Sequence, residues 1–242
     1  MRLDVYLTEN GSCKSRTAAQ SLIKSGGVSV DGKPCTKPSA EVGEGMEVTI
    51  TGEQLRYVGR GGLKLEAALD SFDFLKLTGA VCVDIGSSTG GFTDCMLQNG
   101  AARVYAVDVG TDQLDEKLRC DSRVVVMEQT DIRTAQIPEM ADFIGTDVSF
   151  ISLKAVLPHI HRLLKPSCFA VALIKPQFEA GRASLNKKGV VKDEKTRLRV
   201  VEEIKQFAQQ CGFSVIAVVD SPIQGGDGNI EYLIGLEKVA GL

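Results

Sequence analysis

The sequence predicts an α/β protein: a small α+β unit over residues 1–55, a linker over 56–62, and a mainly parallel sheet covered by helices over 63–242. Two observations predict this class. After residue 63, continuous apolar runs of strand length alternate with segments of helical spacing, which is typical of a parallel sheet buried on both faces. Before residue 56, the elements are shorter and are separated by glycine-containing turns.

The first unit is expected to contain two helices, a hairpin and a final strand. Ser15 is a favourable N-cap for the second helix, and Gly26 and Gly27 favour its end. Asp31 and Gly32 stand between alternating valines and supply the positive φ angles of a tight turn. The expected elements are helices over 2–9 and 16–25, a hairpin over 28–35 and a strand over 48–50.

The second unit begins with a helix whose apolar residues Leu65, Leu69 and Phe72 recur at helical spacing. Runs such as AVCVDIG and CFAVALIKP are continuously apolar, as buried parallel strands are. The last two strands are expected to pair antiparallel. Strands are expected over 80–86, 103–110, 124–131, 142–150, 168–176, 213–221 and 229–238, and helices over 63–72, 90–100, 153–164 and 193–211.

Four charged residues fall at the carboxyl ends of these strands: Asp84, Asp108, Asp147 and Lys175. Ligands of such sheets bind at these ends, near the point where the strand order reverses. The loop 86–92, GSSTGGF, leaves free backbone N–H groups at a helix N-terminus, although such a loop can also merely turn a corner. Asp108 suits a ribose diol, which nicotinamide and methyl-donor cofactors share.

The loop spacing distinguishes between these cofactors. It is GxxxGG rather than GxGxxG, and no phosphate-binding lysine follows, so a dinucleotide is disfavoured. An acid at the end of the third strand, Asp131, can accept a hydrogen bond from an adenine amine. We therefore expect S-adenosylmethionine to bind at Asp84, Gly86, Ser87, Ser88, Gly90, Gly91, Phe92, Asp108 and Asp131.

Length and composition exclude several classes of protein. The chain has 242 residues, of which 43% are hydrophobic and 24% charged, and this balance excludes a mainly disordered chain. No apolar run approaches the roughly 18 residues of a membrane-spanning helix. The start, MRLDVYLTEN, lacks the apolar run of a secretory signal, so a cytoplasmic protein with no membrane partner is expected.

Cysteine and histidine usage argues against a metal centre. The seven cysteines never form CxxC, which favours reduced thiols over a disulfide framework. The only histidines, His159 and His161, are expected at the surface or in packing contacts. No cluster with metal-ligand spacing is present in the sequence, so no metal is expected.

Charge is distributed unevenly although the net charge is only −3. Residues 1–40 carry six Lys and Arg against three acids. The segments RLDVYL, KSRTAAQSLIKSGGVSVDGK and VGEGMEVTI resemble the S4 RNA-binding domain over about fifty residues. The resemblance implies that cations of the second helix and hairpin hold RNA phosphates, which sets register without reading bases. The matching positions are Ser15, Arg16 and Lys24, followed by Lys14 and Lys33.

Four further residues stand in specific strings: GRGGLKLE, TDVSFIS, LIKPQFE and GNIEYL. Taken singly, each is an exposed charge or a structural ion pair. Together they resemble the Lys-Asp-Lys-Glu tetrad of FtsJ-like ribose 2′-O-methyltransferases, formed here by Lys64, Asp147, Lys175 and Glu231. With DIGSSTGGFTD and DVSFISL, the whole chain is similar to the hemolysin A/TlyA family. Longer members carry extra terminal residues, so the breadth of substrates is not carried over.

The resemblance implies a Rossmann-like, S-adenosylmethionine-dependent methyltransferase sheet with an N-terminal S4-type domain. It implies 2′-O-ribose methylation of ribosomal RNA, free or in ribosomal subunits, without an obligate protein partner. A lysine base must be uncharged, whereas its ordinary pKa is about 10.4, so burial and a second lysine are needed. We expect Lys175 as the base, assisted by Lys64, with Asp147 and Glu231 orienting the amines; the sequence leaves open which of the two lysines takes the proton.

Two other functions are open to such a sequence. A non-catalytic, ribosome-associated RNA-binding factor would use the same basic first unit without needing the tetrad. A membrane-active hemolysin, suggested only by the family's historical name, would need a long amphipathic or apolar segment, and none is present in the sequence.

Overall fold

The computed structural model describes residues 1–13, 15–24, 26–50, 56–72, 75–225 and 228–240. The chain forms two compact units, Met1–Arg56 and Tyr57–Leu242. Of the expected linker 56–62, Tyr57 is buried in the second unit, and Gly61 and Gly62 are the first residues of a helix. Each unit has its own core and is described separately.

The first unit packs two helices on a three-stranded antiparallel sheet of order β2-β1-β3. Leu3 and Leu7 of the first helix and Ala19 and Ile23 of the second meet Val28 of the sheet in a small core. The elements are α1 (Leu3–Glu9), α2 (Arg16–Lys24), β1 (Val28–Val30), β2 (Lys33–Pro34) and β3 (Val48–Ile50). The expected α+β unit is confirmed.

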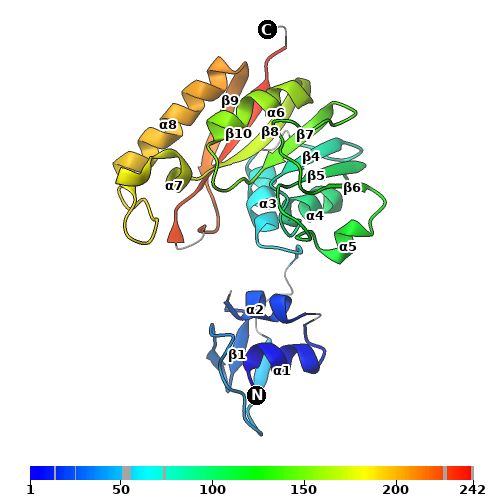
Figure 1. The fold of residues 1–242 in the computed structure, drawn as a ribbon, viewed down its shortest axis with the longest axis vertical. Coiled ribbons are helices and arrows are strands. Elements are labelled where there is room, and N and C mark those ends of the chain that lie inside the picture. Colours follow the sequence, from blue (N-terminus) through cyan, green and yellow to red (C-terminus); the bar gives the residue numbers. More distant parts are fainter. Residues whose placement is uncertain (14, 25, 51–55, 73–74, 226–227, 241–242) are drawn as a thin grey trace. The chain divides into compact units, whose positions relative to one another are not determined.

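The second unit is a seven-stranded sheet of order β6-β5-β4-β7-β8-β10-β9 (Figure 1). All strands run parallel except β10, which pairs antiparallel with both β8 and β9. Its strands are β4 (Val81–Ile85), β5 (Arg103–Val107), β6 (Val124–Met127), β7 (Ala141–Thr146), β8 (Leu164–Ile174), β9 (Phe213–Asp220) and β10 (Tyr232–Lys238). The expected α/β class and the antiparallel final pair are confirmed.

Helices cover both faces of this sheet. The longer ones are α3 (Gly61–Ser71), α4 (Gly91–Gln98), α6 (Leu157–Leu163) and α8 (Glu194–Gln210). The sequence did not predict the short elements α5 (Glu116–Arg119), η1 (Leu153–Ala155), α7 (Pro176–Glu179) and η2 (Arg182–Ser184) as separate turns. One core cluster joins α3 and α4 to the sheet, and the other joins α6 and α8 to it.

The strand order reverses between β4 and β7. From β4 the chain proceeds outward to β5 and β6, and then returns to β7 on the other side of β4. Loops leave β4 and β7 in opposite directions, which opens a crevice at their carboxyl ends. No helix among the described residues is long and apolar enough to cross a membrane.

Candidate active site

Four charged side chains from distant parts of the second unit meet at this crevice. Lys64 Nζ, from α3, lies 2.7 Å from Glu231 Oε2 and 3.4 Å from Asp147 Oδ2. The other oxygen of Asp147 lies 2.6 Å from Lys175 Nζ, at the end of β8. Asp147 therefore bridges two amines, and the structure brings together all four residues of the expected tetrad.

This cluster is poor in solvent. The side chains of Lys64, Lys175 and Glu231 are 9%, 10% and 2% exposed, and that of Asp147 is 18% exposed. Two amines face two carboxylates, so the formal charges of the four groups balance. Buried ions remain charged only when their partners compensate the loss of water, and removal of one partner leaves another charge uncompensated. The four positions are therefore energetically coupled.

The two lysines differ in their surroundings. Lys175 Nζ also donates to Ser149 Oγ at 2.9 Å and lies 5.9 Å from the centroid of the Phe178 ring. Lys64, in contrast, contacts carboxylates from both Asp147 and Glu231. Lys175 lines two cavities, whereas Lys64 lines none of the three cavities described below. Of the two lysines, Lys175 is thus the one placed to meet a ligand in these cavities.

A cavity of about 590 Å³ lies over the carboxyl ends of β4, β5 and β7. Its volume falls within the range of small-molecule sites. Apolar side chains such as Val109 and Ile132 form part of its wall. Of the residues expected to bind a cofactor, Gly86, Ser88, Asp108 and Asp131 line it.

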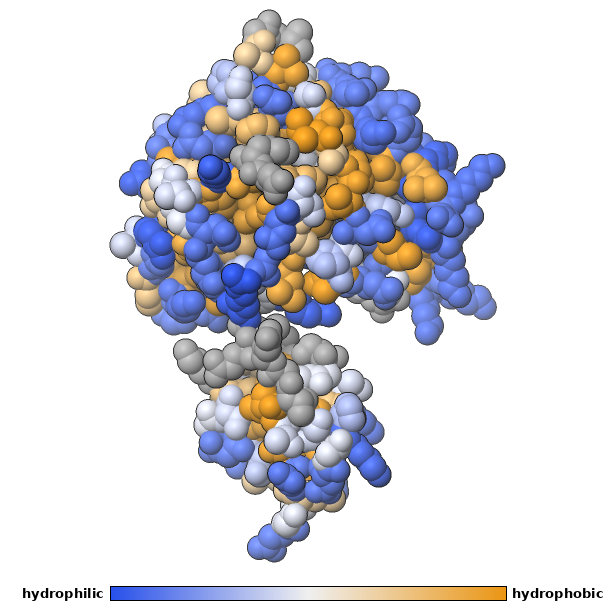
Figure 2. Space-filling model, turned by 180° about the vertical axis from the view of Figure 1, so that it is seen from behind, coloured by the Kyte–Doolittle hydropathy of each residue, from blue (hydrophilic) through white to orange (hydrophobic). Residues whose placement is uncertain are grey.

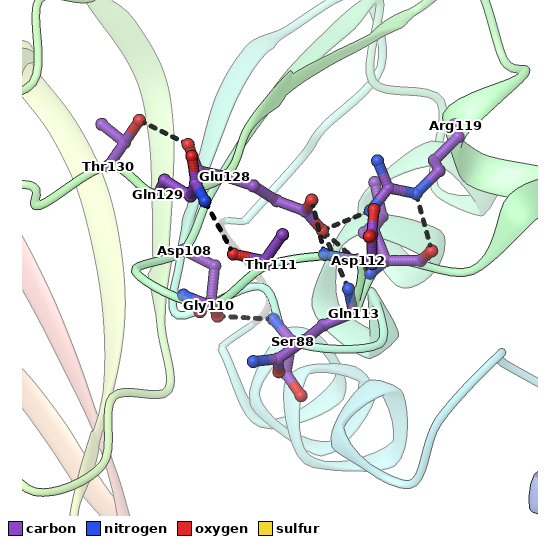
Figure 3. A network of polar contacts seen from close by, with 11 residues as sticks. Ser88, Asp108, Gly110, Thr111, Asp112, Gln113, Arg119, Glu128, Gln129 and Thr130 are labelled. Carbon is purple, nitrogen blue, oxygen red and sulfur yellow. Dashed lines mark hydrogen bonds and ion pairs between the residues drawn. The ribbon is translucent and has the colours of Figure 1, made fainter.

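Asp108 is fixed by two backbone N–H groups, those of Ser88 and Gly110 (Figure 3). Its Oδ2 accepts from Ser88 N at 2.8 Å, and its Oδ1 accepts from Gly110 N at 2.7 Å. A carboxylate can accept about four hydrogen bonds, so two acceptor positions remain. Asp108 can therefore accept from a pair of hydroxyl groups without losing the bonds that hold it.

Asp131 is held differently. Both of its oxygens accept from the guanidinium of Arg133, at 2.6–3.0 Å, and Asp131 also accepts from Arg133 N. The hydrogen bonds from Arg133 lower the pKa of Asp131 to about 2. Both side chains line the cavity, so a ligand meets this ion pair and not a free carboxylate.

Asp84 does not line any of the cavities described. It is fully buried, and its Oδ2 accepts from the backbone N and the hydroxyl of Thr93 at 2.9 and 2.6 Å. Burial raises the pKa of Asp84 to about 7. Through these hydrogen bonds Asp84 connects β4 to the first turn of α4, and the glycine loop lies between these two elements in the chain.

The glycine loop forms a second, narrower cavity of about 190 Å³. Ser87, Gly91 and Phe92 line it, together with Asp147, Ser149 and Lys175. Gly90 lies apart from it: a Cβ there would meet Leu118 Cδ1 at 2.2 Å, on the core side. This narrow cavity shares Gly86 and Ser88 with the larger one, so it connects that cavity to the tetrad.

A third cavity, of about 650 Å³, is also lined by Lys175. Phe150 borders it; this residue is 91% exposed, its φ is +64°, and its ring centroid lies 5.1 Å from that of Phe178. Arg182 and Lys188 also line this cavity. The sequence reasoning did not single out these residues, although Phe150 and Phe178 stand in the strings DVSFIS and KPQFE.

The loop after α7 is strongly cationic. Within 182–195 there are five Lys and Arg against two acids. In the part of the chain that the structure describes, Arg182, Lys187, Lys188 and Lys192 are exposed and make no ion pair. This loop descends from α7 and α8 in Figure 1, and the corresponding margin is hydrophilic when seen from behind in Figure 2.

A carboxylate that the sequence did not reveal supports the cavity of about 590 Å³. Glu128, directly after β6, accepts from Arg119 and from the backbone N–H groups of Asp112, Gln113 and Leu114 (Figure 3). These contacts, chiefly that of Arg119, lower the pKa of Glu128 to about 2. The signal in the sequence was an acid at a strand end, in VVVMEQTD.

The expected RNA-binding residues belong to the first unit. Ser15 Oγ accepts from Ala18 N at 3.2 Å and so caps α2. Arg16 Nε donates to the buried Asp4 at 3.0 Å, although its own side chain is 54% exposed. Lys33 is exposed on β2. Lys14 and the side chain of Lys24 lie outside the described residues.

Comparison with known proteins identifies the family. Residues 57–238 match the family model described as FtsJ-like methyltransferase, and residues 1–48 match that of the S4 domain. The chain belongs to the FtsJ-like methyltransferase family. The expected resemblance to FtsJ-like and S4 proteins is confirmed.

Several relatives of this FtsJ-like chain are similar over nearly its whole length. The YqxC protein of Bacillus subtilis (strain 168) is 48% identical over 97% of this chain and 85% of its own. Hemolysin A of Brachyspira hyodysenteriae is 41% identical over 96% of this chain and 98% of its own. The 16S/23S rRNA (cytidine-2′-O)-methyltransferase TlyA of Mycobacterium tuberculosis (strain ATCC 25618 / H37Rv) is 40% identical over 97% and 89%.

Solved structures agree with this assignment. A chain from Streptococcus thermophilus is 46% identical, with a TM-score of 0.79 over 99% of this chain and 89% of that chain. An S-adenosylmethionine dependent methyltransferase from Mesorhizobium loti is 14% identical, with a TM-score of 0.56 over 74% and 100%. The latter likeness shows the fold alone: the second unit has the fold of these methyltransferases.

Proposed function

We propose that this protein transfers a methyl group from S-adenosylmethionine to a ribose 2′-hydroxyl of ribosomal RNA. One observation carries the proposal: Lys175, paired with Asp147, lines both the glycine-loop cavity, which adjoins the cavity of about 590 Å³ suited to the methyl donor, and the cavity of about 650 Å³ suited to a nucleotide. The names of relatives such as TlyA support the choice of ribosomal RNA and of the 2′-hydroxyl.

The residues of the cavity of about 590 Å³ fit S-adenosylmethionine. Asp108 retains acceptor positions for the two ribose hydroxyls, and Val109 and Ile132 offer apolar surface to a purine. Glycines of the loop allow close approach of the backbone. The bound donor supplies a methyl group on a positively charged sulfur. Asp147 belongs to the tetrad and lines both this cavity and the glycine-loop cavity, so it offers a carboxylate to the positive charge of the donor.

The cavity beyond Lys175 fits a nucleotide drawn out of an RNA strand. Phe150 and Phe178 present aromatic faces on which a base can stack, and stacking is worth about 1–3 kcal/mol per base. Arg182 and Lys188 offer cations to the flanking phosphates. A ribose hydroxyl placed between these groups and the glycine loop lies next to Lys175 Nζ.

Lys175 Nζ, as the uncharged amine, removes the hydroxyl proton while the ribose oxygen attacks the methyl carbon. The new bond joins that oxygen to the methyl group as the methyl–sulfur bond breaks, and the electron pair of the broken bond stays on sulfur as a neutral thioether. The Lys175 amine becomes an ammonium that Asp147, 2.6 Å away, stabilises. Lys64 and Glu231 keep the other oxygen of Asp147 in place. Proton transfer of this kind contributes about 10²–10⁴-fold to a rate.

Substitution of Lys175 tests this assignment. Lys175→Met keeps an apolar chain of similar length but has no amine, so transfer of labelled methyl groups to ribosomal RNA should fall by at least about 10²-fold. Titration calorimetry should still detect donor binding, because Lys175 does not line the cavity of about 590 Å³ that fits the donor. Undiminished turnover in Lys175→Met would remove this lysine from the reaction, and absence of donor binding in the parent would favour a non-catalytic RNA-binding factor.

A further inference from the structure

Ser149 occupies the meeting point of all three cavities. It follows Asp147 by two residues in the loop after β7, and it lines the donor-side, glycine-loop and nucleotide-side cavities alike. Its hydroxyl oxygen accepts a hydrogen bond from Lys175 Nζ at 2.9 Å. We propose that Ser149 is a positioning residue for catalysis, which fixes the direction of the Lys175 lone pair. This inference rests on the proposed function.

The valence of an amine limits the directions that its lone pair can take. An uncharged lysine amine has two N–H bonds and one lone pair at tetrahedral positions. Ser149 Oγ, at 2.9 Å, accepts a hydrogen bond from one N–H, and the Asp147 carboxylate, whose Oδ1 forms an ion pair with Nζ at 2.6 Å, attracts the other. The lone pair must then occupy the remaining direction, and Lys175 lines the glycine-loop and nucleotide-side cavities. With only one N–H bond held, the amine rotates freely between orientations, most of which are unproductive.

The charged groups around Lys175 do not replace this contact. Asp147 faces it from the β7 loop, while Lys64 of α3 and Glu231 before β10 lie beyond Asp147. From α7, Gln177 donates to Glu231 Oε1 at 3.2 Å, and the face of Phe178 offers no directed acceptor. Among the described residues, Ser149 thus provides the one uncharged hydrogen-bond acceptor at this amine.

The loop that carries Ser149 is held in place by its neighbours. Ser152 Oγ donates to Glu179 Oε2 at 2.6 Å, and Leu153 N donates to Glu179 Oε1 at 2.7 Å. Glu179 belongs to α7, which begins directly after Lys175. The same short helix therefore fixes both the base and the loop that orients it, so their separation is defined.

Three substitutions distinguish orientation from packing. Ser149→Ala removes the acceptor, Ser149→Cys keeps nearly the same shape with a weak acceptor, and Ser149→Thr keeps the hydroxyl but adds a methyl group. We expect kcat for methyl transfer to ribosomal RNA to fall at least about 10-fold in the Ala and Cys variants. Ser149→Thr should retain most activity. KM for the RNA and calorimetric donor affinity should stay within about 2-fold of the parent in the Ala and Cys variants, which add no volume to the cavities.

A packing role predicts the opposite order, with Ser149→Cys close to the parent and Ser149→Thr the most impaired. Two outcomes would overturn the role of Ser149 while leaving Lys175 as the base. One is that order of activities, and the other is a kcat of Ser149→Ala within about 2-fold of the parent while Lys175→Met is inactive. Turnover retained in Lys175→Met overturns the inference together with the proposed base. Thermal unfolding of each variant shows whether a loss of kcat reflects a loss of fold.

Discussion

Gly86 is the position at which one added methyl group should damage the fold most directly. It follows β4 with φ at +83°, and a Cβ built there would meet the carbonyl oxygen of Asp147 at 2.6 Å. The next contacts are also backbone atoms, Asp147 C at 3.0 Å and Val148 Cα at 3.3 Å. Backbone cannot rotate away as a side chain can, so Gly86→Ala must displace the strand end that carries Asp147.

A matched control separates this clash from simple backbone strain. Gly79 has φ at +75° and open space around its Cβ, so Gly79→Ala suffers only the strain, about 1–2 kcal/mol. Gly86→Ala adds overpacking, which costs about 1–3 kcal/mol. For a domain of about 150–250 residues, each kcal/mol lowers the melting temperature by about 2–4 °C. The second unit of Gly86→Ala should therefore unfold about 2–12 °C below that of Gly79→Ala.

Calorimetric or circular-dichroism melting of the two variants provides the measurement. Donor titration on folded Gly86→Ala should also show weakened binding, because Gly86 lines both the donor-side cavity of about 590 Å³ and the glycine-loop cavity. Equal melting temperatures for Gly86→Ala and Gly79→Ala would refute the claim that β4 and β7 approach too closely for a side chain.

Three further predictions concern charge. Arg119 holds the pKa of Glu128 at about 2, below the ordinary 4.5, so the contribution of this carboxylate to stability is complete above pH 4.5 and disappears as pH falls towards 2. Urea unfolding over that pH range should therefore show a larger loss of stability in the parent than in Glu128→Gln. Lys187→Ala with Lys188→Ala should weaken RNA binding and reduce the slope of log affinity against log salt by about 1–2 units. Lys33→Ala should weaken RNA binding without changing donor affinity or the melting temperature.

Controls for these predictions come from the same chain. The double variant Lys76→Ala with Lys205→Ala lacks two lysines that line none of the three cavities. Its slope of log RNA affinity against log salt should equal that of the parent. Arg16→Ala should lower both RNA affinity and the stability of the first unit, since Arg16 pairs with the buried Asp4. Equal salt slopes for the two lysine pairs, or equal acid sensitivity of the parent and Glu128→Gln, would contradict the reasoning.

The α/β class was predictable because buried parallel strands are continuously apolar, and those runs coincide with β4, β5 and β8. The short helices α5 and α7 were not, because four residues are too few to show helical periodicity. The four residues of the tetrad could be named only by family resemblance. Their spacing along the chain carries no sign that two carboxylates and two amines meet.

Strand ends alone did not distinguish the roles of the acids. Asp84 and Asp108 both occupy them, yet Asp84 is enclosed with Thr93 whereas Asp108 faces the cavity. That difference depends on which helix packs above each strand end. Asp131 stands beside Arg133 in the sequence, but only the structure shows that both of its oxygens are taken.

The central claim, methyl transfer to a ribose hydroxyl of RNA, is tested most directly by the position of the transferred label. Ribosomal RNA treated with the protein and labelled S-adenosylmethionine is hydrolysed in alkali, which needs a free 2′-hydroxyl at each cleaved bond. We predict label in alkali-resistant dinucleotides with the parent and at least about 10²-fold less with Lys175→Met. Label in mononucleotides, or equal labelling by the two proteins, would contradict it.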